Sequence, residues 1–246
     1  MPIKDILVHA DMTASCRIRL WAAAYLAHRF NAYLTGAGSE EAGAPDGRFM
    51  RMLADEGLPG EWRTATGSIE AVVTRLACAA DLVILGQPDP ERLLVELAAP
   101  EDVILASGRP VMVVPYAGEF EHIGENVLAA WNGGREASRA VHDALPLLIA
   151  SNAVTVLWVD AATEQDAELG DDMIRHLARQ GVDAKLDLAK SKDLPVANIV
   201  VSRANDRDSD LIVMGAYGHS RLRKTIVGDT TRDMLRSMTL PVLMAH

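Results

Sequence analysis

The sequence predicts an α/β protein of two tandem domains, each a mainly parallel five-stranded sheet with helices on both faces. Short apolar runs rich in β-branched residues alternate with segments whose apolar residues recur at helical spacing. This alternation is typical of β-α-β units around a parallel sheet. The same alternation begins again in the second half, after a segment of charged and turn-forming residues, so the fold is expected twice.

The first half has five segments expected to be strands. They are residues 6–10, 33–35, 62–66, 82–85 and 111–114. Apolar residues at helical spacing from Ile18 onward predict a helix, with Asp11 and Thr13 as candidate N-cap residues. A short helix is expected around residues 49–53, inside a loop rich in glycine, proline and charge, and another over residues 69–79.

The second half repeats this order. Strands are expected at residues 127–130, 154–159, 183–188, 211–214 and 242–244. An apolar stripe over residues 137–148, preceded by Asn132 as a candidate helix cap, predicts the first helix. A second helix is expected to end at Gly181, a third to cover residues 196–204, and a last one to begin after Gly228.

Three segments of the first half align with segments of the second. Residues 81–86 match residues 210–215, residues 110–113 match residues 241–244, and residues 5–8 match residues 126–129, at offsets of 129, 131 and 121 residues. The differing offsets place the insertions in loops. The domains are therefore expected at residues 1–117 and 126–246, joined by a linker at residues 118–125.

Composition limits the expected binding partners and the expected cellular compartment. The net charge is −10, which argues against broad binding to nucleic acid or to an anionic membrane. The start of the sequence lacks a signal-peptide pattern, and no apolar run is long enough to span a bilayer. Cys16 and Cys78 form no C-x-x-C pair and are expected to be buried free thiols, with a single disulfide between them as the alternative. We expect a cytoplasmic protein.

The stretch from Asp210 to Thr231 is the candidate binding site. Gly215 and Gly218 directly follow an apolar strand, and Gly228 precedes the expected last helix. Glycines allow a tight turn and a close approach to main-chain N–H groups, and a helix N-terminus attracts anions. Residues 219–224 between them are mostly basic, so this stretch predicts a phosphate-binding turn.

The spacing Gly215-x2-Gly218-x9-Gly228, with its flanking strands, resembles the nucleotide-binding motif of the universal stress protein family. The resemblance covers the whole chain, more strongly in the second half, and implies a tandem member with two Rossmann-like (adenine nucleotide alpha hydrolase-like) domains. It departs from the family at Asp229, where a serine or threonine is expected, and at Asn132, where an acid near the nucleoside is expected.

The resemblance also implies the ligand contacts. Val159 would pack on the base, and the glycines would shape the loop over ribose and phosphates, with charge supplied by His219, Arg221, Arg223 or Lys224. The expected binding residues are Asn132, Val159, Met214, Gly215, Gly218, His219, Arg221, Gly228, Asp229 and Thr230. The ligand would be ATP, ADP or AMP, with Mg²⁺ only alongside ATP.

Asp229 leaves the number of phosphates open. If Asp229 caps the last helix, its carboxylate occupies the place of a phosphate, and like charges repel each other there. If Asp229 is only an N-cap, the motif is either vestigial or accepts AMP or adenosine better than ATP. A Mg²⁺ ion that bridges Asp229 and the phosphates is a further alternative.

The first half lacks this motif. Gly86 is followed by Gln87-Pro88-Asp89-Pro90, and no other glycine occurs before Gly108. Proline has no N–H to offer a phosphate, and the neighbouring acids would repel one. The first site is therefore expected to bind no nucleotide phosphate and to act as a partner surface for the second domain.

No catalytic motif and no metal-ligand spacing occur in the sequence, which favours a binding protein over an efficient enzyme. The expected function is a regulatory or protective stress-response protein that binds an adenine nucleotide in its C-terminal domain. The alternatives are a slow ATP hydrolase, or a non-binding interaction module with a vestigial site. The late strands of each half imply that the domains pair within one chain, and they leave a homodimer open.

Overall fold

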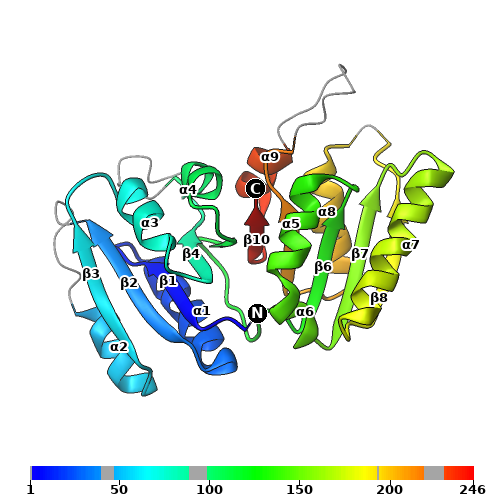
Figure 1. Ribbon diagram of the computed structural model, residues 1–246. Helices are drawn as coiled ribbons and strands as arrows, with labels where there is room; N and C mark the ends of the chain where they lie inside the picture. The colour runs from blue at the N-terminus through cyan, green and yellow to red at the C-terminus, as the bar shows by residue number, and fades with distance from the viewer. Residues whose placement is uncertain (1, 40–46, 89–98, 193, 219–229) are drawn as a thin grey trace. The chain divides into compact units, whose positions relative to one another are not determined.

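The computed structural model describes residues 2–39, 47–88, 99–192, 194–218 and 230–246 (Figure 1). The chain divides into two compact units, Met1–Glu121 and His122–His246, so the boundary falls within residues 118–125. Each unit contains five parallel strands with helices on both faces of the sheet (Figure 1). The fold class predicted from the sequence is confirmed.

In the first unit the sheet has the order β3-β2-β1-β4-β5. Its strands are β1 (Asp5–His9), β2 (Tyr33–Ser39), β3 (Gly60–Ala65), β4 (Leu82–Gly86) and β5 (Val111–Val114). Its helices are α1 (Cys16–Phe30), α2 (Arg48–Glu56), α3 (Ile69–Ala77) and α4 (Pro100–Ala106). Helices α1 and α2 contact each other on one face, and α3 and α4 contact each other on the other.

The start of α1 differs from the prediction. Its N-cap residue is Ser15, and no side chain caps the helix. The carboxylate of Asp11 instead accepts hydrogen bonds from the N–H and the hydroxyl of Thr13, which forms a turn ahead of the helix. The expected capping roles of Asp11 and Thr13 are therefore wrong, because the two residues bond to each other in the turn that precedes the helix.

In the second unit the sheet has the order β10-β9-β6-β7-β8. Its strands are β6 (Asn126–Trp131), β7 (Ala153–Val159), β8 (Ala184–Ala189), β9 (Leu211–Gly215) and β10 (Val242–Ala245). Its helices are α5 (Arg135–Asp143), α6 (Leu145–Ile149), α7 (Glu164–Arg179), α8 (Val196–Asp206) and α9 (Thr230–Ser237). Helices α5 to α7 lie on one face, and α8 and α9 contact each other on the other.

The apolar stripe over residues 137–148 forms two helices rather than one. Helix α5 ends at Asp143, and α6 begins at Leu145 with Pro146 in its first turn. A proline is tolerated in the first turn of a helix but not in its interior, so the break falls where the sequence requires it. Gly181, by contrast, follows the end of α7 with φ of +83°, as predicted.

The strand registers confirm the internal repeat. Ile6 pairs with Leu82 in the first unit, and Val127 pairs with Leu211 in the second. These two pairs occupy the same positions in the two sheets, as the sequence alignment predicted. The neighbouring strands agree as well, because Val83 pairs with Val111 and Ile212 pairs with Val242.

The repeat extends to a side chain at the amino edge of each sheet. Asp81 accepts hydrogen bonds from the N–H groups of Lys4 and Asp5, at 2.7 and 3.0 Å. Asp210 accepts from the N–H groups of Gly124, Glu125 and Asn126, at 2.8 to 3.2 Å. Burial raises the pKa of Asp210. In both units a carboxylate thus fixes the chain as it enters the first strand.

The cores are mainly aliphatic, and all side chains of β4, β5 and β10 are buried. Cys16 is buried, but Cys78 is exposed, so the expectation of two buried thiols is wrong for Cys78; both are free. None of the helices in the described part of the chain is long and apolar enough to cross a membrane.

Candidate functional site

The candidate site lies at the carboxyl edge of the second sheet, where three neighbouring strands end together. Trp131 of β6 pairs with Trp158 of β7, and Ala130 pairs with Met214 of β9. The next residues along these strands are therefore neighbours at one edge. This places the predicted residues Asn132, Val159 and Gly215 side by side, where ligands bind in open α/β sheets.

Asn132 is exposed, and its side-chain oxygen accepts a hydrogen bond of 2.9 Å from the N–H of Gly134. Gly134, rather than Asn132, is the N-cap residue of α5, so the predicted capping role of Asn132 is wrong. The intervening Gly133 has φ of +68° and lies over the ring of Trp158, which a Cβ would approach to 3.3 Å. The turn presents the amide of Asn132 at the edge of the sheet.

Gly215 is required by packing. A Cβ at this position would lie 2.5 Å from the main-chain N of Ala137 and 2.5 Å from the carbonyl carbon of Glu136. The first turn of α5 therefore packs directly against the end of β9, and only glycine allows this approach. The neighbouring Met214 is 5% exposed and belongs to the core, so only its main chain is available to a ligand.

The turn after β9 is tied to the start of α9. The N–H of Tyr217 donates a hydrogen bond of 2.9 Å to the hydroxyl of the buried Thr231. Tyr217 has φ of +54°, in the left-handed region, and Thr230 is the first residue of α9. The predicted Gly218 and Thr230 are therefore held near each other, with the N-terminus of α9 beside the turn.

One side chain in this site was not predicted. A Cβ on Gly218 would lie 3.1 Å from a carboxylate oxygen of Glu136, so Glu136 faces the turn from the first turn of α5. The sequence held a usable signal, since Glu136 is an acid in the first helical turn after the strand that bears Asn132. The predicted His219, Arg221, Gly228 and Asp229, with Arg223 and Lys224, lie outside the described residues.

The corresponding edge of the first unit is filled by a buried arginine. Arg19 of α1 is 1% exposed, and its Nη2 donates a hydrogen bond of 2.6 Å to the carboxylate of Asp11. Its Nε donates to the carbonyl oxygen of His9 at 3.2 Å. Its Nη1 is buried and points toward Gly86, where any Cβ would collide with it.

This cluster sets the charge states of its members. Burial opposes ionisation of Asp11, but the Arg19 guanidinium and the hydrogen bonds from Thr13 together outweigh burial, so the pKa of that carboxyl is lowered. Burial, together with the charge of Arg19, lowers the pKa of His9 to about 3. The edge of the first sheet therefore holds a neutral imidazole and an internal ion pair at neutral pH.

Among the described residues, no three His, Cys, Asp or Glu side chains converge in an arrangement that could hold a metal ion.

The fold and the glycine turn define an α/β protein built from Rossmann-like domains. The model of the universal stress protein family matches residues 125–246, which form nearly all of the second unit. The chain belongs to the universal stress protein family, a stress-response family, and the resemblance noted in the sequence is confirmed.

Comparisons with individual proteins agree with this family and with the observed fold. A universal stress protein of Synechocystis sp. is 28% identical over 147 residues, which are 58% of this chain and 49% of the relative, so the chain spans about half the length of that curated relative. A universal stress protein from Archaeoglobus fulgidus DSM 4304 has a TM-score of 0.75 at 13% identity, covering 98% of this chain and 95% of that one. A functionally unknown protein from Pseudomonas aeruginosa PAO1 has a TM-score of 0.67 at 15% identity, covering 99% and 92%. These two structures share the fold.

Proposed function

We propose that the second unit binds an adenine nucleotide at the carboxyl edge of its sheet and that the chain acts as a regulatory or protective protein in a stress response. The observation that supports this most directly is the hydrogen bond from Tyr217 to Thr231. It holds the glycine turn against the N-terminus of α9, and unpaired main-chain N–H groups at such a terminus favour an anion. Family membership supports the same conclusion.

In this proposal the nucleoside lies against Asn132 and Val159, and the phosphates lie at the turn of Gly215 and Gly218 and at the start of α9 with Thr230. His219, Arg221, Gly228 and Asp229 complete the proposed contacts on the ground of the sequence alone. The main chains of Met214 and Gly215 would contribute, since the side chain of Met214 is buried. Mg²⁺ would accompany ATP only.

Glu136 bears on which nucleotide binds. Its carboxylate faces Gly218, and a phosphate at that turn would meet a like charge at close range. Asp229 adds a second acid in the sequence nearby. We therefore expect the affinity to fall as phosphates are added, from AMP to ATP, with Mg²⁺ restoring part of the affinity for ATP.

The same observation favours a second candidate function. If Glu136 permanently occupies the place of a phosphate, the site is vestigial and the chain is an interaction module without a ligand. Native mass spectrometry of the purified protein, followed by calorimetric titration with AMP, ADP and ATP, separates the two functions. Saturable binding of at least one nucleotide supports the proposal, and no binding of any of them at millimolar concentration contradicts it.

A matched pair of variants locates the binding. Gly218→Leu should abolish it, because the new side chain would fill the turn beside Glu136. Asp89→Leu, at the aligned position of the first half, should leave affinity unchanged. Phosphate release from ATP is measured on the same samples, and release that survives Gly218→Leu would come from elsewhere.

A further inference from the structure

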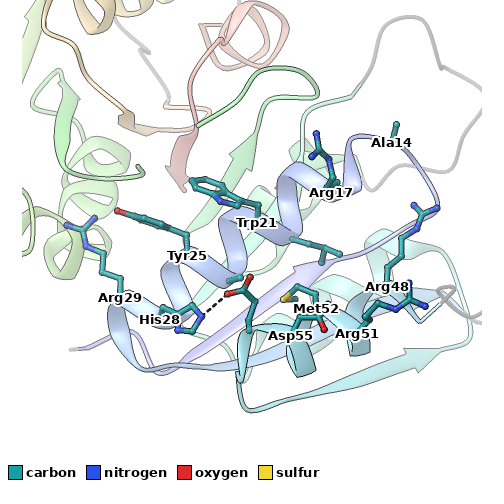
Figure 2. A pocket seen from close by; sticks show the side chains of 13 residues that line it. Ala14, Arg17, Trp21, Tyr25, His28, Arg29, Arg48, Arg51, Met52 and Asp55 are labelled. Carbon is teal, nitrogen blue, oxygen red and sulfur yellow. Dashed lines mark hydrogen bonds and ion pairs between the residues drawn. The ribbon is translucent and has the colours of Figure 1, made fainter. Parts of the chain in front are cut away.

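A groove of about 1020 Å³ lies between α1 and α2 in the first unit (Figure 2). Its lining residues come from these two helices and from Ala14, just ahead of α1. Small-molecule sites are typically clefts of about 300–1,000 Å³. The groove is therefore large enough for one ligand, and it belongs to the unit whose sheet edge is filled by Arg19.

The middle of the groove is apolar. Leu20 is buried beneath it, and Trp21 and Met52 are partly exposed along it. The ring of Trp21 stacks on that of Tyr25, with centroids 5.3 Å apart. Partly exposed aromatic and thioether side chains of this kind form an adaptable apolar surface for an alkyl chain or a ring.

One end of the groove is cationic. Figure 2 shows Arg17 on α1 and Arg48 and Arg51 on α2 at this end, each from the first turn of its helix. Neither helix has an acid in that turn, although acids are the residues that a helix N-terminus favours. Among the described residues, Arg17 and Arg51 have no acidic partner. This local excess of positive charge contrasts with the net charge of −10.

The opposite end has different chemistry. His28 Nε2 lies 3.1 Å from a carboxylate oxygen of Glu56, and Asp55 and Arg29 also line this part of the groove. The charge at this end is therefore mixed, whereas none of the described acidic residues lines the groove at the end of Arg17, Arg48 and Arg51. An anion with an apolar body would therefore bind mainly with its charge at the arginines and its body along Trp21 and Met52.

We propose that the groove between α1 and α2 binds a small amphipathic anion, a molecule with one carboxylate, sulfonate or phosphate group and an apolar chain or ring. Arg17 and Arg51 would bind the anionic group through charge-assisted hydrogen bonds. This site is separate from the proposed nucleotide site, since all of its lining residues belong to the first unit.

Two soluble probes test the proposal on the full chain. Anilinonaphthalene sulfonate should bind saturably with enhanced fluorescence, and decanoate should displace it while the uncharged decyl maltoside does not. Arg17→Glu and Arg51→Glu should each weaken binding about tenfold or more, because each replaces an attraction by a repulsion. Arg75→Glu, the same charge change on α3 of the opposite face, should bind as the parent protein does.

The expected result is thus anion-selective binding that depends on Arg17 and Arg51 and that AMP does not displace. Absence of saturable binding, equal displacement by decyl maltoside, or equal affinity of the Arg51→Glu and Arg75→Glu variants would each overturn the proposal. Displacement by AMP would assign the probe to the nucleotide site and would also overturn it. Because Arg17 and Arg51 are exposed, their variants should fold, which circular dichroism verifies.

Discussion

At the carboxyl edge of its sheet, the first unit has a buried guanidinium where the second has the main chain of α5 and the carboxylate of Glu136. Asp11 and Asn132 lie at equivalent positions, since both follow their strands at the offset of 121 residues that relates β1 to β6. At the same offset, Arg19 of the first unit corresponds to Ala140 of the second. The first unit thus keeps an acid and neutralises it internally.

The second unit has the glycines of the motif, with asparagine rather than an acid at position 132. Its Gly215 accommodates the backbone of α5, whereas Gly86 accommodates the side chain of Arg19. The same glycine at the end of the same strand therefore serves two purposes. A duplicated sheet edge can be satisfied from within by an ion pair, as in the first unit, or bind an external ligand, as we propose for the second.

The largest expected effect comes from removing the internal cation. Arg19→Met leaves the largely buried carboxylate of Asp11 without its partner, and breaking such a pair typically costs about 3–5 kcal/mol of unfolding free energy. Urea denaturation measures this loss. Arg17→Met, two residues earlier and exposed, is the matched control and should change stability by less than about 0.5 kcal/mol.

Removing both Asp11 and Arg19 tests whether the unpaired charge causes the loss of stability. In Asp11→Leu combined with Arg19→Met, no charge remains uncompensated, so most of the stability lost in Arg19→Met should return. A double variant as unstable as Arg19→Met would show that the packing of the arginine, and not its charge, fills the first edge.

The second-largest expected effect concerns Gly215, the glycine that ends β9 as Gly86 ends β4. Gly215→Ala places a Cβ against the rigid backbone of α5 and should cost about 1–3 kcal/mol, as overpacking does. Among the described residues, Gly218→Ala meets only the movable carboxylate of Glu136, and it should cost less than about 0.5 kcal/mol. Thermal unfolding of the two variants compares them. Equal losses would mean that α5 can shift away from β9.

The pH dependence of stability should arise mainly in the first unit. His9 stays neutral in the folded state down to a pKa of about 3, whereas its unfolded value is 6.5. As pH falls below 6.5, His9 binds a proton in the unfolded chain but not in the folded chain. Stability is thus complete above pH 6.5 and falls by up to about 1.4 kcal/mol for each further pH unit.

Urea midpoints at pH 7.5 and pH 5 measure this loss, and hydrogen exchange of the β1 amides assigns it to the first unit. His9→Gln should abolish most of the difference between the two pH values, whatever its effect at pH 7.5. The lowered pKa of Asp11 does not interfere, because its contribution is lost only below 3.8. An undiminished pH dependence in the variant would exclude His9 as its source.

The sequence predicted the elements that depend on periodicity. The strands Leu82–Gly86 and Leu211–Gly215 were expected within one residue of their ends, because a buried parallel strand is a continuous apolar run. Helix α4 was not predicted, since its seven residues are too few to show a helical period. The break after Asp143 shows that an apolar stripe does not reveal where one helix ends and the next begins.

The site was only partly predictable for a related reason. A glycine motif predicts a turn, but it does not show what fills the space beside each glycine. Arg19 comes ten residues after the His9 carbonyl that it binds, and Glu136 lies far in sequence from Gly218. Such contacts depend on the packing of a helix against a sheet, which no local pattern encodes.

The smallest expected effect tests whether the second edge is open to phosphates. Glu136→Gln removes a negative charge beside Gly218 and keeps nearly the same shape. If phosphates bind at this turn, the affinity for ATP should rise by about tenfold, as expected for removing a like charge near a partly exposed anion. The affinity for adenosine should not change, because adenosine has no phosphate. Calorimetric titration without Mg²⁺ measures both.

Glu61→Gln, an equal change of charge on exposed β3 of the first unit, serves as the control for net charge. It should leave both affinities as they are, since a change of net charge alone is largely screened at physiological salt. A parallel rise for ATP and adenosine in Glu136→Gln would indicate that Glu136 restricts access to the site. Unchanged affinities would place the phosphates away from Gly218. They would also show that Glu136 does not affect nucleotide binding at the edge of the second sheet.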